Sequence, residues 1–241
     1  TPDQDDLPPE RDPRAPGLPG ERLARPDETP PEYWRAFSIV AFTMNRFIVD
    51  QVLRASRLFD EPSYRERAER YLNFVLKTQR PDGSWPYEAS GTRDFIDHFH
   101  TCFVLKALAK IEKNVGHEDC GSSLERGVDF YARELFDQDG LPKPFYKAPR
   151  LTVYRNELYD YAECINLGVL LRGRFTALDK RTDRAIDDLL TRWQKPDGSF
   201  RSRRLLLGWD NVPMHRWGQS QVFRSLCLAL GVKASLDRPS S

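Results

Sequence analysis

Acidic, basic and aromatic side chains with the potential for chemistry gather in three polar stretches of the sequence, near residues 93–100, 147–163 and 201–219. Five of these side chains are the candidates for moving protons: Asp97, His100, Tyr154, Glu163 and His215. Eight others are candidates for holding a ligand: His98, Arg155, Asp160, Trp209, Asp210, Arg216, Trp217 and Gln219. The three polar stretches are therefore the place to look for a function.

This combination of residue types suits a sugar chain. Flat aromatic rings stack on pyranose rings, and arginines pair with the carboxylates of uronates. Paired carboxylates can perform glycosidic acid–base work, and a tyrosine or histidine can move a proton alpha to a uronate carboxyl. Hydrolase, lyase and epimerase chemistry all remain open.

Several of these residues also have purely structural interpretations. An alternative role for Asp97 is purely structural, as the N-cap of a helix. His98 and His100 face different directions on a helix, so we expect no shared metal ion and no cofactor. Glu163 begins a buried helix, and a buried carboxylate needs a partner such as Arg155 or Arg216. Single tryptophans such as Trp209 and Trp217 could simply fill space.

A repeated phrase indicates the elements that position these residues. Gln79–Trp85 reads QRPDGSW, Phe136–Leu141 reads FDQDGL, and Gln194–Phe200 reads QKPDGSF. From Asp82 to Asp139 is 57 residues, and from Asp139 to Asp197 is 58. A fixed period of roughly 50 residues indicates a stacked array of helical hairpins.

Each phrase lies between two kinds of helical stretch. The stretch before it has one apolar stripe and starts near Ser63, Ser122 or Thr182, where the first two serines fit a capping box. The stretch after it is apolar nearly all round: Thr101–Ile111, Cys164–Leu171 and Ser220–Leu230. Outer helices paired with the buried inner helices that follow them predict an all-α protein, an α/α toroid. Its three loops should open at one end, with His100, Glu163 and Gln219 near the floor of one cavity.

The domain boundaries follow from composition. Residues 1–31 are rich in proline and charge and should form a disordered arm, because they cannot bury enough apolar surface. The toroid domain should span 32–235, beginning with an inner-type helix at 32–59, and 236–241 should be a flexible tail. A closed toroid of five or six hairpins needs about 290–350 residues. The chain is therefore part of a longer one, which we favour, or its toroid is open.

Composition narrows the choice of partners. The 241 residues carry 37 Lys and Arg against 36 Asp and Glu, which argues against a nucleic-acid partner. No apolar run reaches the roughly 20 residues of a transmembrane helix, and the N-terminus shows no secretion-signal pattern. The four cysteines are far apart, so we expect buried free thiols and a cytoplasmic protein.

The QxPDGS(W/F) phrase in alternating helix pairs resembles that of the prenyltransferase and terpene-cyclase superfamily, over about residues 62–231. The acidic DxDD signature of the cyclases is absent from this region, and so is the zinc set of the protein prenyltransferases. Two further phrases, FIDHFHT at Phe95–Thr101 and HRWGQS at His215–Ser220, resemble toroid proteins encoded with bacterial polysaccharide-biosynthesis enzymes. That resemblance implies work on a surface glycan and carries over no catalytic residue.

The leading hypothesis is a glycan-acting protein of polysaccharide biosynthesis or modification, with an oligo- or polysaccharide as its partner. The alternative is a non-catalytic scaffold that binds a partner protein in a biosynthetic complex. An enzyme of terpenoid or prenyl transfer is a third hypothesis, weakened by the missing motifs.

Overall fold

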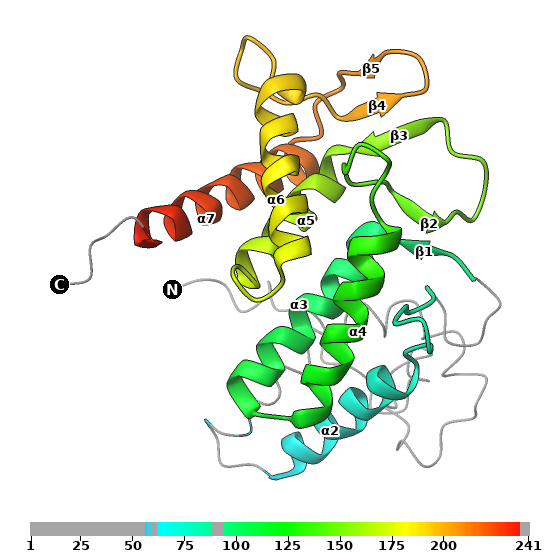
Figure 1. The fold of residues 1–241 in the computed structure, drawn as a ribbon, viewed down its shortest axis with the longest axis vertical. Coiled ribbons are helices and arrows are strands. Elements are labelled where there is room, and N and C mark those ends of the chain that lie inside the picture. Colours follow the sequence, from blue (N-terminus) through cyan, green and yellow to red (C-terminus); the bar gives the residue numbers. More distant parts are fainter. Residues whose placement is uncertain (1–55, 57, 59–61, 88–93, 237–241) are drawn as a thin grey trace, which may run out of the picture. The chain divides into compact units, whose positions relative to one another are not determined.

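A computed structural model describes residues 56, 58, 62–87 and 94–236 of the chain (Figure 1). Its α-helices are α2 (Pro62–Lys77), α3 (His98–Val115), α4 (Glu118–Glu134), α5 (Leu158–Leu170), α6 (Thr176–Asp188) and α7 (Ser220–Leu236). Two π-helical turns, η2 (Leu189–Trp193) and η3 (His215–Gln219), and five short strands complete the described elements. The expected arm at 1–31, nearly all of the helix at 32–59 and the tail after residue 236 fall outside the described residues.

The helices form the two layers of an α/α toroid, as predicted. α5 packs against α3 and α7 in the inner layer, while α4 packs against α3 and α6 packs against α5 from outside. The pairing within hairpins was predicted wrongly. The short connections are Gly116–His117 and 171–175, so each inner helix pairs with the outer helix that follows it.

The repeated phrase folds into the same tight turn three times. In each copy the glycine (Gly83, Gly140 or Gly198) has a positive φ, between 78° and 92°, which a side chain would strain. In the first copy the Asp82 carboxylate accepts hydrogen bonds from the backbone N–H and the hydroxyl of Ser84. Trp85 then folds back onto α2 and donates its indole N–H to the carbonyl oxygen of Val75 at 2.9 Å.

Short antiparallel strands join the three loops to one another. β1 (Ile96–Asp97) of the first loop pairs with β2 (Phe145–Lys147) of the second. β3 (Tyr154–Glu157) of the second loop pairs with β4 (Arg203–Leu205) of the third, which pairs with β5 (Trp209–Asp210). The loops therefore lie at one end of the inner helices (Figure 1), as expected.

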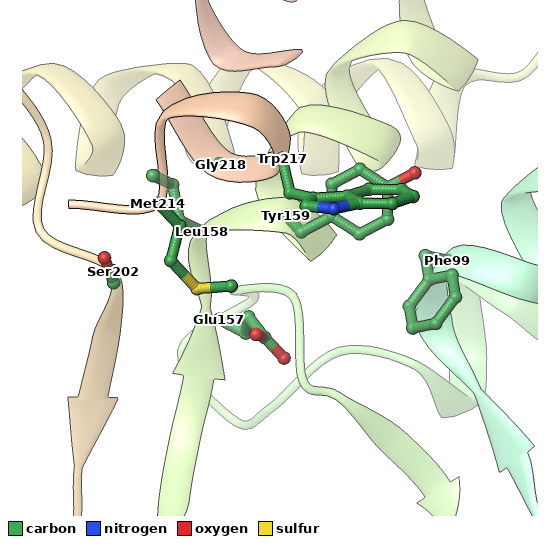
Figure 2. A pocket seen from close by; sticks show the side chains of 8 residues that line it. All are labelled: Phe99, Glu157, Leu158, Tyr159, Ser202, Met214, Trp217 and Gly218. Carbon is green, nitrogen blue, oxygen red and sulfur yellow. The ribbon is translucent and has the colours of Figure 1, made fainter. Parts of the chain in front are cut away.

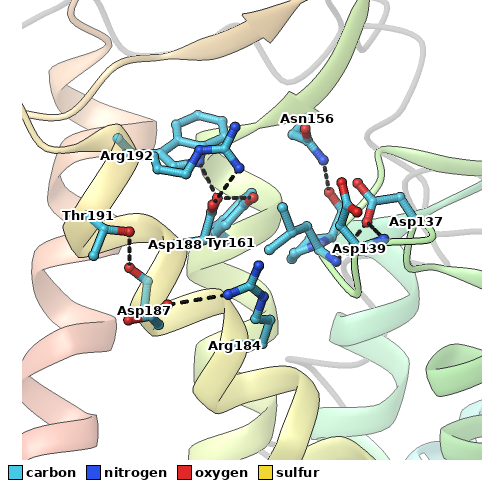
Figure 3. A network of polar contacts seen from close by, with 12 residues as sticks. Asp137, Asp139, Asn156, Tyr161, Arg184, Asp187, Asp188, Thr191 and Arg192 are labelled. Carbon is cyan, nitrogen blue, oxygen red and sulfur yellow. Dashed lines mark hydrogen bonds and ion pairs between the residues drawn. The ribbon is translucent and has the colours of Figure 1, made fainter.

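A buried carboxylate fastens the junction of α5, α6 and η2 (Figure 3). Asp188 is 3% exposed and accepts hydrogen bonds from the Tyr161 hydroxyl at 2.8 Å and the Trp193 indole at 2.9 Å. Arg192 adds an ion pair at 3.1 Å. A π-helical turn brings residues five apart in the sequence to the same side of the helix. Asp188 and Trp193 have this spacing, so their side chains meet in the core.

The predicted starts of three helices were wrong. α4 begins at Glu118 and α6 at Thr176, so Ser122 and Thr182 lie inside helices, and α2 begins at Pro62, one residue before Ser63. In place of capping, the Thr182 hydroxyl bonds the carbonyl oxygen of Leu178. α7 is also not covered on every side: Phe223 is 71% exposed and Leu230 is 67% exposed.

The four cysteines are free thiols. Cys102, Cys120 and Cys164 are buried, as predicted, and burial raises the pKa of each of them. Cys227 on α7 is exposed, because it lies on the uncovered side of that helix.

Candidate functional site

A pocket of about 320 Å³ opens where the second and third loops meet the inner helices (Figure 2). It is lined by Phe99, Glu157, Leu158, Tyr159, Ser202, Met214, Trp217 and Gly218. These residues come from α3, from the junction of β3 with α5, from the loop before β4, and from η3 with the residue before it. The pocket therefore draws on all three repeats.

Three aromatic rings form a continuous wall of this pocket. The centroids of Phe99 and Tyr159 lie 5.3 Å apart, and those of Tyr159 and Trp217 lie 5.6 Å apart at 88°. Trp217 is 59% exposed, which is unusual for an indole. Trp217 reaches the pocket because η3 packs closely against α5 at the next residue, Gly218. A Cβ on Gly218 would lie only 2.9 Å from the Leu158 side chain. Exposed rings of this kind can stack on a flat ligand.

Glu157 provides a fixed negative charge at the pocket. Arg203 donates to one Glu157 carboxylate oxygen through Nε at 3.1 Å and through Nη2 at 2.8 Å. The guanidinium also lies 5.1 Å from the ring centroid of Tyr154. Burial is the main cause that raises the pKa of Tyr154 to about 12, so its hydroxyl keeps its proton near neutral pH.

Asp97 and His100 form a pair at the first turn of α3. The Asp97 carboxylate accepts the backbone N–H of His100 at 2.8 Å, which is the N-cap bond, and also contacts Nδ1 of the same residue. Asp97 is 4% exposed. The capping interpretation of Asp97 is therefore confirmed. Its second contact orients an imidazole, which the cap alone does not require.

Asp160 is the carboxyl group whose surroundings are the least favourable to a charge. It is 1% exposed and follows directly on three residues that line the pocket. Burial is the main cause that raises its pKa well above the usual range, and the carboxylates of Glu157, Asp97 and Glu163 raise it further. Its Oδ2 atom is buried without a hydrogen-bond partner within the described residues. Asp160 thus combines a raised pKa with a buried polar atom that has no partner within the described residues.

Glu163 has a partner that the sequence did not suggest. Its carboxylate pairs with the Lys106 ammonium on α3, and not with Arg155 or Arg216 as expected. Lys106 also lies 5.0 Å from the ring centroid of Phe103. Tyr159 hydrogen-bonds Glu163, but burial is the main cause that raises the pKa of Tyr159. Neighbouring positions on α3 and α5 bring these groups together, one turn beyond Asp160.

His98 belongs to the core. It is fully buried, with Nδ1 contacting the carbonyl oxygens of Leu135 and Lys143, and with the Tyr131 hydroxyl 2.7 Å from Nε2. Burial lowers its pKa to about 3, so the ring is neutral. Both ring nitrogens of His98 are therefore engaged in contacts within the core. The predicted role of His98 in ligand binding stays a prediction, and these contacts do not support it.

The candidates of the third loop divide into two groups. The Gln219 side chain accepts a hydrogen bond from the backbone N–H of Phe200 and donates one to its carbonyl oxygen. These bonds hold Gln219 on the third loop and do not link it to His100 or Glu163. Trp209 packs edge-on against Trp193, and Asp210 accepts the backbone N–H of Val212. The remaining candidates, His215 and Arg216 of η3 and Arg155 of β3, are exposed. Trp217 alone of the predicted site residues lines the pocket.

Sequence reasoning missed Phe99, Ser202, Met214 and Lys106, and it left Glu157 and Tyr159 out of the proposed site. Lys106 carried a usable signal, because it is one of only two charges, with Lys110, within the apolar stretch Thr101–Ile111. Met214 and Ser202 carried none, since their place depends on how the third loop folds.

The described residues contain no group of three or more His, Cys, Asp or Glu side chains that could hold a metal ion. No cofactor site is indicated by the residues around the pocket. In the described part of the chain, no helix is both long enough and apolar enough to cross a membrane.

Comparison with known proteins finds matches only at the level of structure: no protein-family model and no curated protein matches the sequence. A family 88 glycosyl hydrolase from Bacteroides vulgatus superposes with a TM-score of 0.61 at 13% identity, over 79% of this chain and 62% of that one. A polysaccharide lyase gives a TM-score of 0.61 at 12% identity, over 83% and 63% of the two chains. A cellobiose 2-epimerase from Bacillus thermoamylovorans gives 0.60 at 11%, over 82% and 56%.

These similarities confirm the α/α-toroid fold. At such low identities they show the fold alone, and the chain spans about three fifths of the length of these structures. None of the three is a prenyltransferase or a terpene cyclase, so that superfamily assignment gains no support from them.

Proposed function

We propose that the protein acts on a glycan, binding a saccharide in the pocket between Phe99, Tyr159 and Trp217. The exposed aromatic wall carries this proposal, because sugar rings stack on flat aromatic faces and the exposed indole has no evident structural purpose. The fold adds support, since the toroids that resemble the chain include a hydrolase, a lyase and an epimerase of carbohydrates.

The polar groups beside the pocket suit proton transfer to and from a sugar. The raised pKa of Asp160 favours its protonated form, whereas Glu157 is held by the Arg203 cation. A neutral acid beside a second carboxylate is the pairing that glycosidic chemistry uses. Asp97 with His100 is a second pair that can exchange a proton, and it suits abstraction alpha to a uronate carboxyl. Tyr154 and His215 complete the proposed proton-transfer set.

Uronate-containing saccharides are the substrate class that we favour. Arg203 lies beside the pocket, and the exposed Arg155 and Arg216 lie on elements that form it. Guanidinium groups bind carboxylates in a bidentate way, which a neutral sugar does not exploit. Polysaccharide biosynthesis or modification is the setting that we propose for this activity.

A saccharide panel tests the proposal. Binding of neutral and uronate oligosaccharides is followed by calorimetry and by tryptophan fluorescence, and product release is followed by chromatography. We expect a uronate oligosaccharide to bind and Trp217→Ala to weaken that binding at least tenfold. Phe223→Ala is the matched control, because Phe223 is an equally exposed aromatic that lies outside the pocket.

The outcomes separate three functions. Binding with turnover establishes an enzyme, whereas binding without turnover by any member of the panel supports a carbohydrate-binding scaffold. If no saccharide binds, or if Trp217→Ala binds as well as the unchanged protein, the pocket is not the site.

A further inference from the structure

A second surface of the protein is apolar, basic and separate from the pocket lining. It consists of two loop tips with the adjoining strand ends, 150–155 leading into β3 and 204–208 leading out of β4. Four aliphatic side chains protrude there: Leu151 is 90% exposed, Val153 63%, Leu206 53% and Leu207 92%. We call this surface the aliphatic tip.

Backbone hydrogen bonds hold the two halves of the aliphatic tip together. The Leu206 N–H donates to the carbonyl oxygen of Val153 at 3.1 Å, and the Leu205 N–H donates to Gly208 at 3.0 Å, which closes the β4–β5 turn. Tyr154 and Leu205 are partners in the strand register. The exposed aliphatic side chains therefore belong to one structured surface.

The charge around the aliphatic tip has one sign. No acidic residue occurs between Phe145 and Asn156 or between Phe200 and Trp209, while six basic residues do. Lys147, Arg201 and Arg203 are engaged with Asp94, Asn211 and Glu157. No ion pair within the described residues involves the other three, Arg150, Arg155 and Arg204. These arginines are therefore available to an anionic partner.

We propose that the aliphatic tip docks on an anionic lipid bilayer surface. Protruding leucines and a valine can enter the region between headgroups and acyl chains, while arginines just behind them meet lipid phosphates. The side chains are aliphatic, and a sugar chain would instead favour flat aromatic rings. Leu151 and Leu207 protrude almost fully into solvent, which suits insertion into a surface better than lining a groove for a peptide segment.

Vesicle sedimentation tests this proposal on the full chain. Vesicles of phosphatidylcholine with 30% phosphatidylserine, the probe composition, are compared with vesicles of pure phosphatidylcholine. We expect binding to the anionic vesicles only, and at least a tenfold weaker partition in 0.5 M NaCl, because screening weakens the attraction between arginine and lipid.

Paired variants localise the contact. Leu206→Glu/Leu207→Glu should lower the partition at least tenfold, and Arg150→Gln/Arg204→Gln should lower it about tenfold. The control is Leu230→Glu on α7, an equally drastic change at an exposed leucine outside the tip. It should bind vesicles as the unchanged protein does. Circular dichroism confirms that each variant is folded.

Three results would overturn the proposal. One is a lack of binding to anionic vesicles, and another is a loss of binding in Leu230→Glu as large as that in the tip variants. The third is binding of the tip to soluble polygalacturonate with no binding to vesicles, which would assign the arginines to a polyanionic glycan.

Discussion

Two buried aspartates at the open end of one hairpin, α5–α6, show how this fold separates stability from function. Asp188, at the end of α6, is 3% exposed and receives bonds from Tyr161, Trp193 and Arg192. Asp160, at the start of α5, is 1% exposed and has an oxygen without a partner in the described residues. The Asp188 carboxylate therefore has several hydrogen-bond donors around it, whereas Asp160 keeps a buried oxygen without a donor in the described residues. A buried polar group that the fold does not satisfy is most readily explained by a ligand that does.

The largest effect on stability should come from Asp188→Asn. The amide group removes the negative charge and turns one acceptor into a donor, which leaves Tyr161, Trp193 or Arg192 without its bond. We expect the free energy of unfolding to fall by about 3 kcal/mol, measured by urea denaturation. Asp187→Asn is the control, because the neighbouring Asp187 side chain is 63% exposed and should change stability by less than about 0.5 kcal/mol. Equal effects from both would remove Asp188 from its structural role.

Breaking the Lys106–Glu163 ion pair should lower the free energy of unfolding by less than Asp188→Asn does. Lys106→Met leaves the Glu163 carboxylate, which is 3% exposed, without its cation, and we expect a loss of about 2 kcal/mol. Adding Glu163→Gln should recover most of that loss, since the stranded charge is then gone. A double variant no more stable than the single one would show that Lys106 stabilises the helix by packing alone.

The two buried titratable groups His98 and Asp160 should give stability opposite dependences on pH. His98 has its pKa lowered to about 3 in the fold, so its contribution is full above pH 6.5 and is lost as pH falls. Asp160 has a raised pKa, so its contribution is full below pH 4 and is lost as pH rises. Between about pH 4 and 6.5 the two slopes oppose each other.

Removing one group should expose the slope of the other. In Asp160→Asn, stability should rise more steeply with pH between pH 5 and 6 than in the unchanged protein, because the opposing contribution of Asp160 is gone. Thermal denaturation across this range measures it. Identical profiles for the two proteins would mean that Asp160 is ionised in the fold, and its proposed role as an acid would then fail.

The smallest effect is expected at the pocket itself. A Cβ in Gly218→Ala would lie 2.9 Å from the end of the Leu158 side chain, which can shift. We expect a loss of about 0.5–1 kcal/mol together with altered access to the pocket, because η3 must move away from α5. Saccharide affinity that changes while thermal stability barely does would support this view. A loss of stability above about 2 kcal/mol would instead identify Gly218 as a core position.

The sequence was sufficient for the architecture and only partly sufficient for the site. The three Asp-Gly phrases predicted three similar turns and the common loop end, because turn chemistry is local and repeats with the fold. Helix starts at Ser122 and Thr182 were wrong because serine and threonine also occur inside helices, where they bond a preceding carbonyl. The Lys106–Glu163 pair and the place of Met214 depend on contacts between helices and on the path of a long loop, and neither is encoded in local spacing.

The central claim is that Asp160 serves ligand binding and Asp188 serves the stability of the fold. Two matched variants, each measured in two ways, test it most directly. Asp160→Asn and Asp188→Asn are compared by urea denaturation at pH 7 and by calorimetric titration with the uronate oligosaccharide that binds best. We predict that Asp160→Asn is at least as stable as the unchanged protein but loses turnover or at least tenfold in affinity. Asp188→Asn should lose stability and, while folded, keep its affinity. Asp160→Asn that is destabilised while binding and turnover persist would contradict the account.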